Sequence, residues 1–103
     1  MASEPLKLFN GTLTTTLTTT LYTVPASTTV IVKGVTLCNY DTVARTVTLT
    51  FDATYVLNAY SIAANDSILI PFYDQVLLTT DIIKGGASAN AVVDICISGK
   101  AIT

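Results

Sequence analysis

The sequence predicts an all-β protein: a single small antiparallel β-sandwich or jelly roll of seven or eight short strands, preceded by an extended N-terminal arm. Apolar residues alternate with polar ones at a period of two, and turn-forming residues separate these runs about every 8–12 positions. No stretch shows the period of about 3.6 residues that marks an amphipathic helix. The chain of 103 residues forms one domain, because two halves would each be too small to bury a core.

Residues 1–20 are predicted to form the arm, and residues 21–103 the sandwich. Leu13, Leu17 and Leu21 recur every four positions in a run that is otherwise almost entirely threonine. This spacing fits a helix or a strand, but β-branched threonine favours the extended chain. The arm has little apolar surface of its own. We therefore expect its leucines to bind another chain, with main-chain hydrogen bonds along a sheet edge.

Three strands are expected in the first half of the sandwich. The first two span residues 21–24 and 28–38, and a change of facing at Gly34 predicts a β-bulge in the second. A turn over residues 39–42 leads into residues 45–52, where apolar residues alternate with threonine. The residues of this strand expected in the core are Val47, Leu49 and Phe51.

Five short strands are expected in the second half, with turn residues between them. Pro71 lacks an amide donor, so it restricts its strand to a sheet edge or a bulge. The glycines of residues 84–90 predict a hairpin loop before the last strand. The expected strands are residues 55–58, 60–64, 67–72, 75–80 and 91–98. The side chains expected to face the core are those of Ile68, Ile70, Phe72, Val93, Ile95 and Ile97.

The composition excludes several classes of protein. Half of the residues are apolar and 12% are charged, against about 25% charged in an average soluble protein. The combination of high apolar content and low charge excludes disorder. It fits a chain that covers much of its surface with partners. A net charge of −2 does not provide the basic surface that nucleic-acid binding requires. Without histidine, the usual acid–base sites and most zinc sites cannot form, so we expect no enzyme, metal or cofactor.

Neither a targeting signal nor a membrane partner is expected. Residues 1–10 lack the apolar core of a secretory signal, and no apolar run is long enough for a membrane helix. We therefore expect synthesis in a reducing cytoplasm. Cys38 and Cys96 lie in apolar strand-like runs and are interpreted as buried free thiols; a disulfide between neighbouring strands is the alternative.

Polar and aromatic residues offer only weak candidates for a site. Most aspartates fall in or beside turns, where their side chains bond the local main chain, and Asp94 is expected on the solvent side of the last strand. The aromatic residues either form a platform for sugar rings or fill the rim of the core, and the rim is favoured. The residues concerned are Tyr40, Tyr55, Tyr60, Phe72 and Tyr73.

The order of several segments resembles small structural proteins encoded by tailed bacteriophages, over roughly residues 21–99. The segments are LYTVPA (21–26), IVKGVTLCN (31–39), RTVTLT (45–50), AAND (63–66) and VDICISG (93–99). The resemblance implies a β-sandwich component of the virion. Such proteins act in capsid decoration (as cement proteins) or as modules of the tail, baseplate or fibre.

The expected function is therefore that of a non-enzymatic virion protein, a capsid decoration or cement protein that stabilises the particle through its arm and apolar surfaces. The alternative is a receptor- or carbohydrate-binding module of the tail, baseplate or fibre. The expected partners are copies of the chain itself, with a trimer favoured, and other virion proteins such as the major capsid protein. The protein is expected in the virion after synthesis in the host bacterial cytoplasm.

Overall fold

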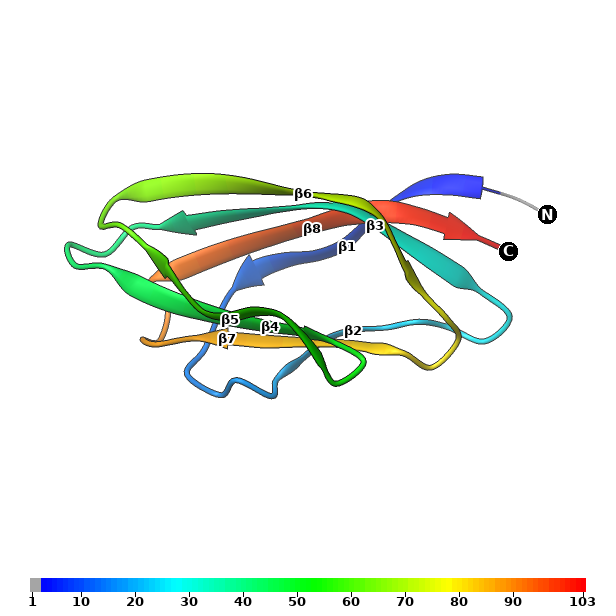
Figure 1. Cartoon of the computed structure of the whole chain (residues 1–103), viewed down its shortest axis with the longest axis horizontal. Coiled ribbons are helices and arrows are strands. Elements are labelled where there is room, and N and C mark those ends of the chain that lie inside the picture. Colours follow the sequence, from blue (N-terminus) through cyan, green and yellow to red (C-terminus); the bar gives the residue numbers. More distant parts are fainter. Residues whose placement is uncertain (1–2) are drawn as a thin grey trace.

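The computed structural model consists of two four-stranded antiparallel sheets packed face to face (Figure 1). It describes residues 3–103, with all of their side chains except those of residues 3, 5, 6 and 72–74. The strands are β1 (Ser3–Thr12), β2 (Thr20–Thr23), β3 (Thr29–Asn39), β4 (Arg45–Phe51), β5 (Thr54–Ile62), β6 (Asp66–Leu77), β7 (Ile82–Ala87) and β8 (Val93–Ile102). Sheet A has the order β1-β8-β3-β6, and sheet B has the order β2-β7-β4-β5.

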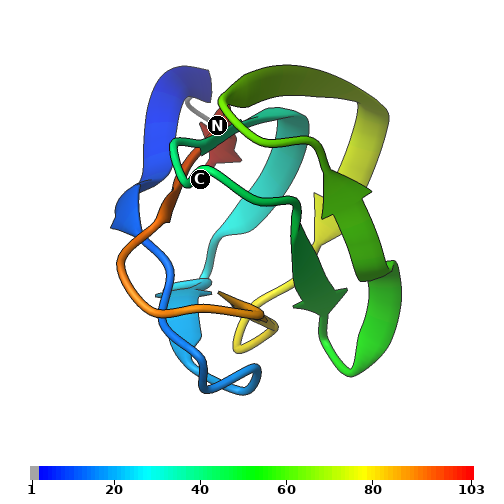
Figure 2. The same ribbon diagram turned by 90° about the vertical axis from the view of Figure 1, so that its left-hand side faces the viewer.

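The connections follow the jelly-roll topology. Only the β4–β5 connection stays within one sheet; every other connection crosses between the two layers (Figures 1 and 2). The molecule is elongated, with principal extents of 46 × 21 × 19 Å, and the start of β1 and the end of β8 lie at the same end of the long axis (Figure 1). The predicted all-β sandwich of seven or eight strands is confirmed.

The core lies between the two sheets and follows the period-two alternation of the strands. Val47, Leu49 and Phe51 of β4 are buried as predicted. Of the threonines between them, Thr50 is partly exposed, whereas Thr48 is also buried and its hydroxyl accepts a hydrogen bond from the amide of Ala59 at 3.2 Å. The same alternation on β8 buries its odd-numbered apolar residues, as predicted. Those residues are Val93, Ile95 and Ile97.

Two pairs of predicted short strands are continuous in the structure. The predicted strands 55–58 and 60–64 merge into β5, which ends at Ile62. Its pairing with β4 shifts register twice, and its Ala59 has a φ of 50°. Residues 67–72 and 75–80 largely belong to β6, where Ile68 and Ile70 pack against the core as predicted. The predicted orientation of Phe72 lies outside the described side chains.

Three other features of the strands match the sequence analysis. Strand β6, which contains Pro71, is an edge strand of sheet A, as the missing amide donor of proline predicts. The register of β3 shifts between Val32 and Gly34, which is the predicted bulge. The turn expected between the predicted strands 60–64 and 67–72 also forms, with a φ of 56° at Asn65.

The predicted glycine-bearing hairpin loop at residues 84–90 is wrong in its first half, because Gly85 and Gly86 are in strand β7. A Cβ atom on Gly85 would lie 2.9 Å from the Cδ1 of Leu49 and 2.9 Å from the main-chain oxygen of Thr48. The strand therefore needs glycine for close packing against β4. Gly85 is thus required for this close packing and not for a turn, which is what the sequence suggested.

The predicted free arm over residues 1–20 is also wrong for the residues that the structure describes. Residues Ser3–Thr12 form β1, which pairs with β8 of the same chain. Residues 14–19, which we call the strap, then run beside β7. The amides of Ala87 and Gly85 donate to the main-chain oxygens of Thr14 (2.8 Å) and Thr19 (3.0 Å). The main-chain hydrogen bonds that such a segment needs are thus supplied within the chain.

Candidate interaction surface

The described part of the chain contains no pocket and no cluster of three or more potential metal ligands. Within residues 3–103, no helix is long and apolar enough to cross a membrane. In the part of the chain that the structure describes, the places where this fold can meet a partner are therefore its sheet faces and edges.

The structure separates the three leucines that were expected to bind a partner together. Leu13 is 1% exposed and belongs to the core of its own chain, with its amide donating to the oxygen of Val93. Leu17 lies in the strap and is 45% exposed. Leu21, in β2, is partly buried against the core. Of the three, only Leu17 presents a largely exposed side chain to a second molecule.

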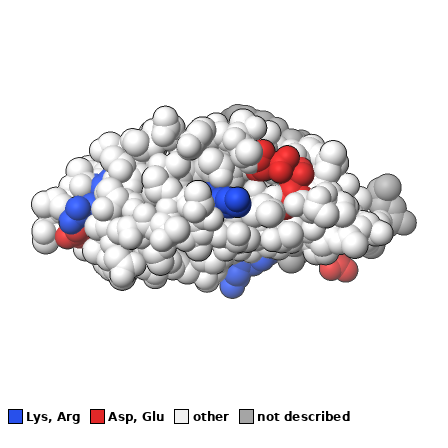
Figure 3. Space-filling view, turned by 90° about the horizontal axis from the view of Figure 1, so that it is seen from below, with Lys and Arg blue, Asp and Glu red and all other residues white. Residues whose placement is uncertain are grey.

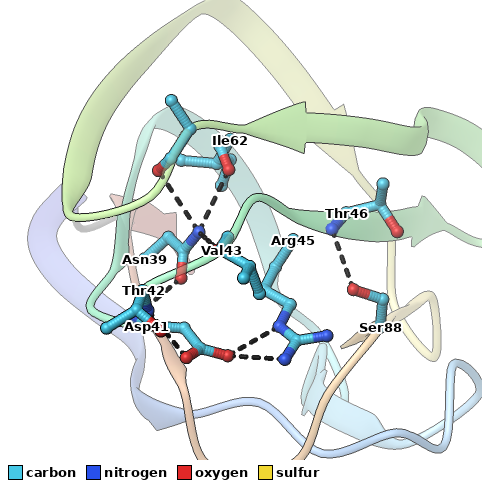
Figure 4. Close-up of polar contacts among 9 residues, drawn as sticks. Asn39, Asp41, Thr42, Val43, Arg45, Thr46, Ile62 and Ser88 are labelled. Atoms are coloured by element: carbon cyan, nitrogen blue, oxygen red, sulfur yellow. Dashed lines mark hydrogen bonds and ion pairs between the residues drawn. The ribbon is translucent and has the colours of Figure 1, made fainter.

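Asn39 is a buried polar residue that the sequence analysis placed in a turn. Its Nδ2 atom donates to the oxygens of Val43 (3.1 Å), Ile62 (3.0 Å) and Ala63 (3.2 Å), and its Oδ1 atom accepts from the amide of Asp41 (3.0 Å) (Figure 4). These bonds join the β3–β4 and β5–β6 loops. The sequence did contain an indication that Asn39 is buried. Position 39 follows the core-facing Val35 and Leu37 at the same spacing of two residues, so its side chain also points into the core. The role of Asn39 is structural.

Arg45 and Asp41 form an ion pair at the same end of the sandwich (Figure 4). The Nε of Arg45 donates to Oδ2 of Asp41 at 2.7 Å, and the amide of Thr42 donates to Oδ1 at 2.7 Å. The hydrogen bond from Arg45, followed by that from Thr42, lowers the pKa of Asp41 below its ordinary value. The pair holds the β3–β4 loop, and no substrate-sized space adjoins it in the described structure.

The tyrosines do not form a single platform for a sugar ring. Tyr55 of β5 pairs with the outward-facing Thr50, whereas Tyr60 pairs with the inward-facing Val47, so the two rings leave the strand on different sides. The hydroxyl of Tyr40 donates to the main-chain oxygen of Ala91 at 2.9 Å and so ties a loop to the sandwich. Tyr73 lies outside the described side chains.

The outer face of sheet A, meaning the side chains of that sheet that point away from sheet B, is the best-defined open surface. The register places one row of residues across all four of its strands. This row contains no charge and ends at Leu69, whose side chain is 69% exposed at the edge strand β6. From β1 to β6, its members are Asn10, Cys96, Thr36 and Leu69.

A second row on this face lies toward the Asn39 end of the sheet. It contains Thr12, Asp94, Cys38 and Ser67. The hydroxyl of Thr12 donates to the carboxylate of Asp94 at 2.6 Å, which fixes the only acidic side chain of this row. Together, the two rows make a continuous surface of mainly small side chains across the four strands, on the outside of the sandwich.

Both cysteines lie on this outer face, where each is partly exposed and carries a free thiol. Cys38 is paired with Asp94, and Cys96 is paired with Thr36, so the two thiols are diagonal neighbours on adjacent strands. The predicted free thiols are therefore confirmed, whereas their predicted burial is wrong. The prediction of burial failed because Cys38 and Cys96 have the opposite parity to the core residues Leu37 and Ile95.

Charge is unevenly distributed along the outer face of sheet A. Asp94 is exposed on the solvent side of β8, as predicted, and it lies near the Asn39 end of the face. Lys7 is exposed opposite Ser98, and Lys100 alternates with the inward-facing residues of β8. Lys33 is exposed at the bulge of β3. Among the described side chains, one end of this face is thus acidic, and its middle and other end carry the lysines.

The opposite side of the molecule, where sheet B faces outward, also has few charges (Figure 3). Part of sheet B is covered by the strap, because a Cβ atom on Gly86 would lie 2.7 Å from the oxygen of Thr16 and 3.0 Å from the Cα of Leu17. This side therefore lacks the uninterrupted four-strand surface that sheet A offers.

No protein-family model matches the chain, and no curated protein is similar to it in sequence.

Proposed function

We propose that this chain is a non-enzymatic structural protein of a tailed-bacteriophage virion, and specifically a capsid decoration or cement protein. The observation that carries the proposal is the continuous four-strand outer face of sheet A, which offers a broad contact surface on a domain without a pocket in its described part. Such a surface suits contact with another protein better than recognition of a small molecule. The virion location rests on the resemblance of residues 21–99 to phage structural proteins.

The proposed partners are copies of the chain and other virion proteins such as the major capsid protein. The low charge of the chain supports this choice, because the uncharged row from Asn10 to Leu69 can be covered without desolvating an ion. Contact through the sheet face replaces contact through the N-terminal arm, since residues Ser3–Thr12 are paired within the chain. The protein acts in the virion after synthesis in the bacterial cytoplasm.

The experiment is an analysis of the protein composition of particles of a phage whose genome encodes this chain. Purified heads and tails are separated, the chain is quantified by mass spectrometry, and intact particles are labelled with gold-conjugated antibody. Hundreds of copies on the head support the decoration protein. A few copies on the tail overturn the decoration protein in favour of the tail-associated binding module. Absence from purified particles overturns the virion assignment itself.

A further inference from the structure

We propose that the outer face of sheet A binds the same face of a second copy of this chain, about a two-fold axis that runs across the strands at the level of Val35 and Ile97. These two residues are paired in the register, and Ile70 of β6 and Phe9 of β1 lie at the same level. The inference rests on the self-association part of the proposed function and adds its face and its symmetry. Sheets that pack face to face with their strands roughly aligned are a common arrangement.

The opposite charges on β8 select this axis, and the rotation places Lys7 of each copy over the uncharged Asn10 of the other. Asp94 and Lys100 are each three residues from Ile97 on β8, and both belong to the outward-facing parity of that strand. A two-fold rotation at the level of Ile97 reverses the strand direction of the second copy. Asp94 of each copy then lies over Lys100 of the other. Opposite charges thus meet twice in one contact, as a self-complementary interface requires.

The apolar residues on the face agree with the same axis. Leu69 and Pro71 flank Ile70, which lies at the level of the axis. The rotation therefore places the exposed side chain of Leu69 over Pro71 of the second copy. Between them and β1 the face carries small side chains, among them those of Thr36 and Cys96, which allow two sheets to approach to the usual distance of about 10 Å.

The size of the face is sufficient for a specific dimer. Four strands spaced about 4.8 Å apart, each with about ten residues rising about 3.3 Å, give a face of roughly 600 Å² per copy. A dimer would then bury about 1,200 Å² in total, which is at the lower end of specific protein interfaces. We therefore expect reversible association at micromolar concentrations and above.

A second copy fits this face better than a strongly charged partner. A polyanion would be repelled at the Asp94 end, and a basic protein would be repelled by the lysines. A copy of the same face presents both charges in the reversed order that complements them. The expected occupant of this face is therefore a second copy of the chain, in a homodimer formed by the two outer faces of sheet A.

The first test compares two leucine variants. Leu69→Asp places a charge on the edge strand of the proposed contact, one residue from the level of the two-fold axis, whereas Leu17→Asp places the same charge on the strap at the opposite sheet. Both positions are largely exposed, so both variants should keep the fold, which circular dichroism and thermal melting check. Sedimentation velocity over a concentration series should show at least about a tenfold weaker dimer for Leu69→Asp, because burying an unpaired charge is costly. Leu17→Asp should match the unchanged chain.

The second test exchanges the charges that define the axis. Lys100→Glu and Asp94→Lys should each weaken the dimer, because like charges then meet at both ends of the contact. An equimolar mixture of the two variants should restore association as a heterodimer, since every contact again joins opposite charges. Lys84→Glu, on sheet B, is the matched control and should change nothing. Asp94→Asn retains an acceptor for Thr12 and separates loss of charge from loss of that hydrogen bond.

Each remaining outcome overturns the inference. A chain that stays monomeric at submillimolar concentration, a trimer, or a dimer indifferent to Leu69→Asp excludes the two-fold contact of sheet A. So does a mixture of charge variants that fails to associate. These outcomes leave the virion assignment standing if the chain is found in purified particles. Absence from particles, together with the expected dimer, would remove the virion assignment and keep the interface.

Discussion

The side-chain amide of Asn39, on sheet A, donates a hydrogen bond to the main-chain oxygen of Ile62, on sheet B, across 3.0 Å. The same nitrogen also reaches the oxygens of Val43 and Ala63, and Asn39 itself is fully buried. No buried side-chain nitrogen or oxygen atom of the described residues lacks a partner. One amide therefore satisfies the main chain of two loops that meet at the end of the sandwich.

Replacement of Asn39 should cost a substantial part of the stability. Asn39→Leu keeps the approximate size but removes the donor, so that three main-chain oxygens lose their partner. We expect the free energy of unfolding in urea to fall by about 2–4 kcal/mol, since an unsatisfied buried group costs about 1–3 kcal/mol. Asn58→Leu, at an exposed position of β5, is the control and should have little effect. Equal stability of the two variants would contradict the role of Asn39.

Leu13 and Leu17 should respond very differently to truncation, although both belong to the same threonine-rich run. Leu13→Ala removes a side chain that is 1% exposed and should lower the free energy of unfolding by about 2–5 kcal/mol. Leu17→Ala removes one that is 45% exposed and should cost less than about 1 kcal/mol. Chemical denaturation of both variants checks this. Similar losses at the two positions would mean that the strap does not lie as described.

Deletion of residues 1–20 should prevent stable folding. The deletion removes β1, takes Leu8 and Leu13 out of the core and leaves the full length of β8 as an unpaired edge. We expect the truncated chain to lose its cooperative thermal transition and to aggregate, as measured by circular dichroism and light scattering. A truncated chain that melts like the intact one would instead restore the separate arm that the sequence suggested.

Gly86 should not tolerate a methyl group. Its added Cβ atom would lie 2.7 Å from the oxygen of Thr16 and 2.8 Å from that of Thr14, and neither main-chain atom can rotate away. Gly86→Ala must displace the strap, so we expect a loss of about 1–3 kcal/mol of stability. Gly34→Ala is the matched control, because its nearest atom would be the oxygen of Ile70 at an ordinary 3.7 Å. A loss of the same size in both variants would argue against a steric cause.

The pH dependence of stability should include a contribution from Asp41. Its pKa is lowered in the folded chain, first by the hydrogen bond from Arg45 and then by that from Thr42. This contribution is present above the pKa of the unfolded chain and is lost as the pH falls through the lower folded value. Arg45→Leu should therefore raise the pKa of Asp41 toward its ordinary value and reduce the acid-induced loss of stability. Carboxyl chemical shifts measured by NMR across the acid range give the pKa directly; an unchanged pKa would contradict the prediction.

The alternation of residues by itself determined the fold class and much of the core. Val47, Leu49 and Phe51 could be assigned to one face of a strand because side chains on a strand alternate between its two faces, whatever the strand packs against. The restriction of Pro71 to a sheet edge or a bulge also followed from the chain alone, since proline has no amide donor for a second neighbouring strand, and the structure places it on an edge strand. These properties depend only on a residue and its immediate neighbours in the chain, so they can be predicted from the sequence alone.

The tertiary structure alone decided which strands pair and, with that, which surface is open. The run from Thr12 to Leu21 needs hydrogen-bond partners, but nothing in its residues says whether those partners belong to the same chain. The glycines of β7 look like a loop until the strap and β4 are seen against them. The row from Asn10 to Leu69 joins four strands that are distant in sequence. Register between distant strands depends on how the whole sandwich packs, and for that reason no single segment could reveal this surface.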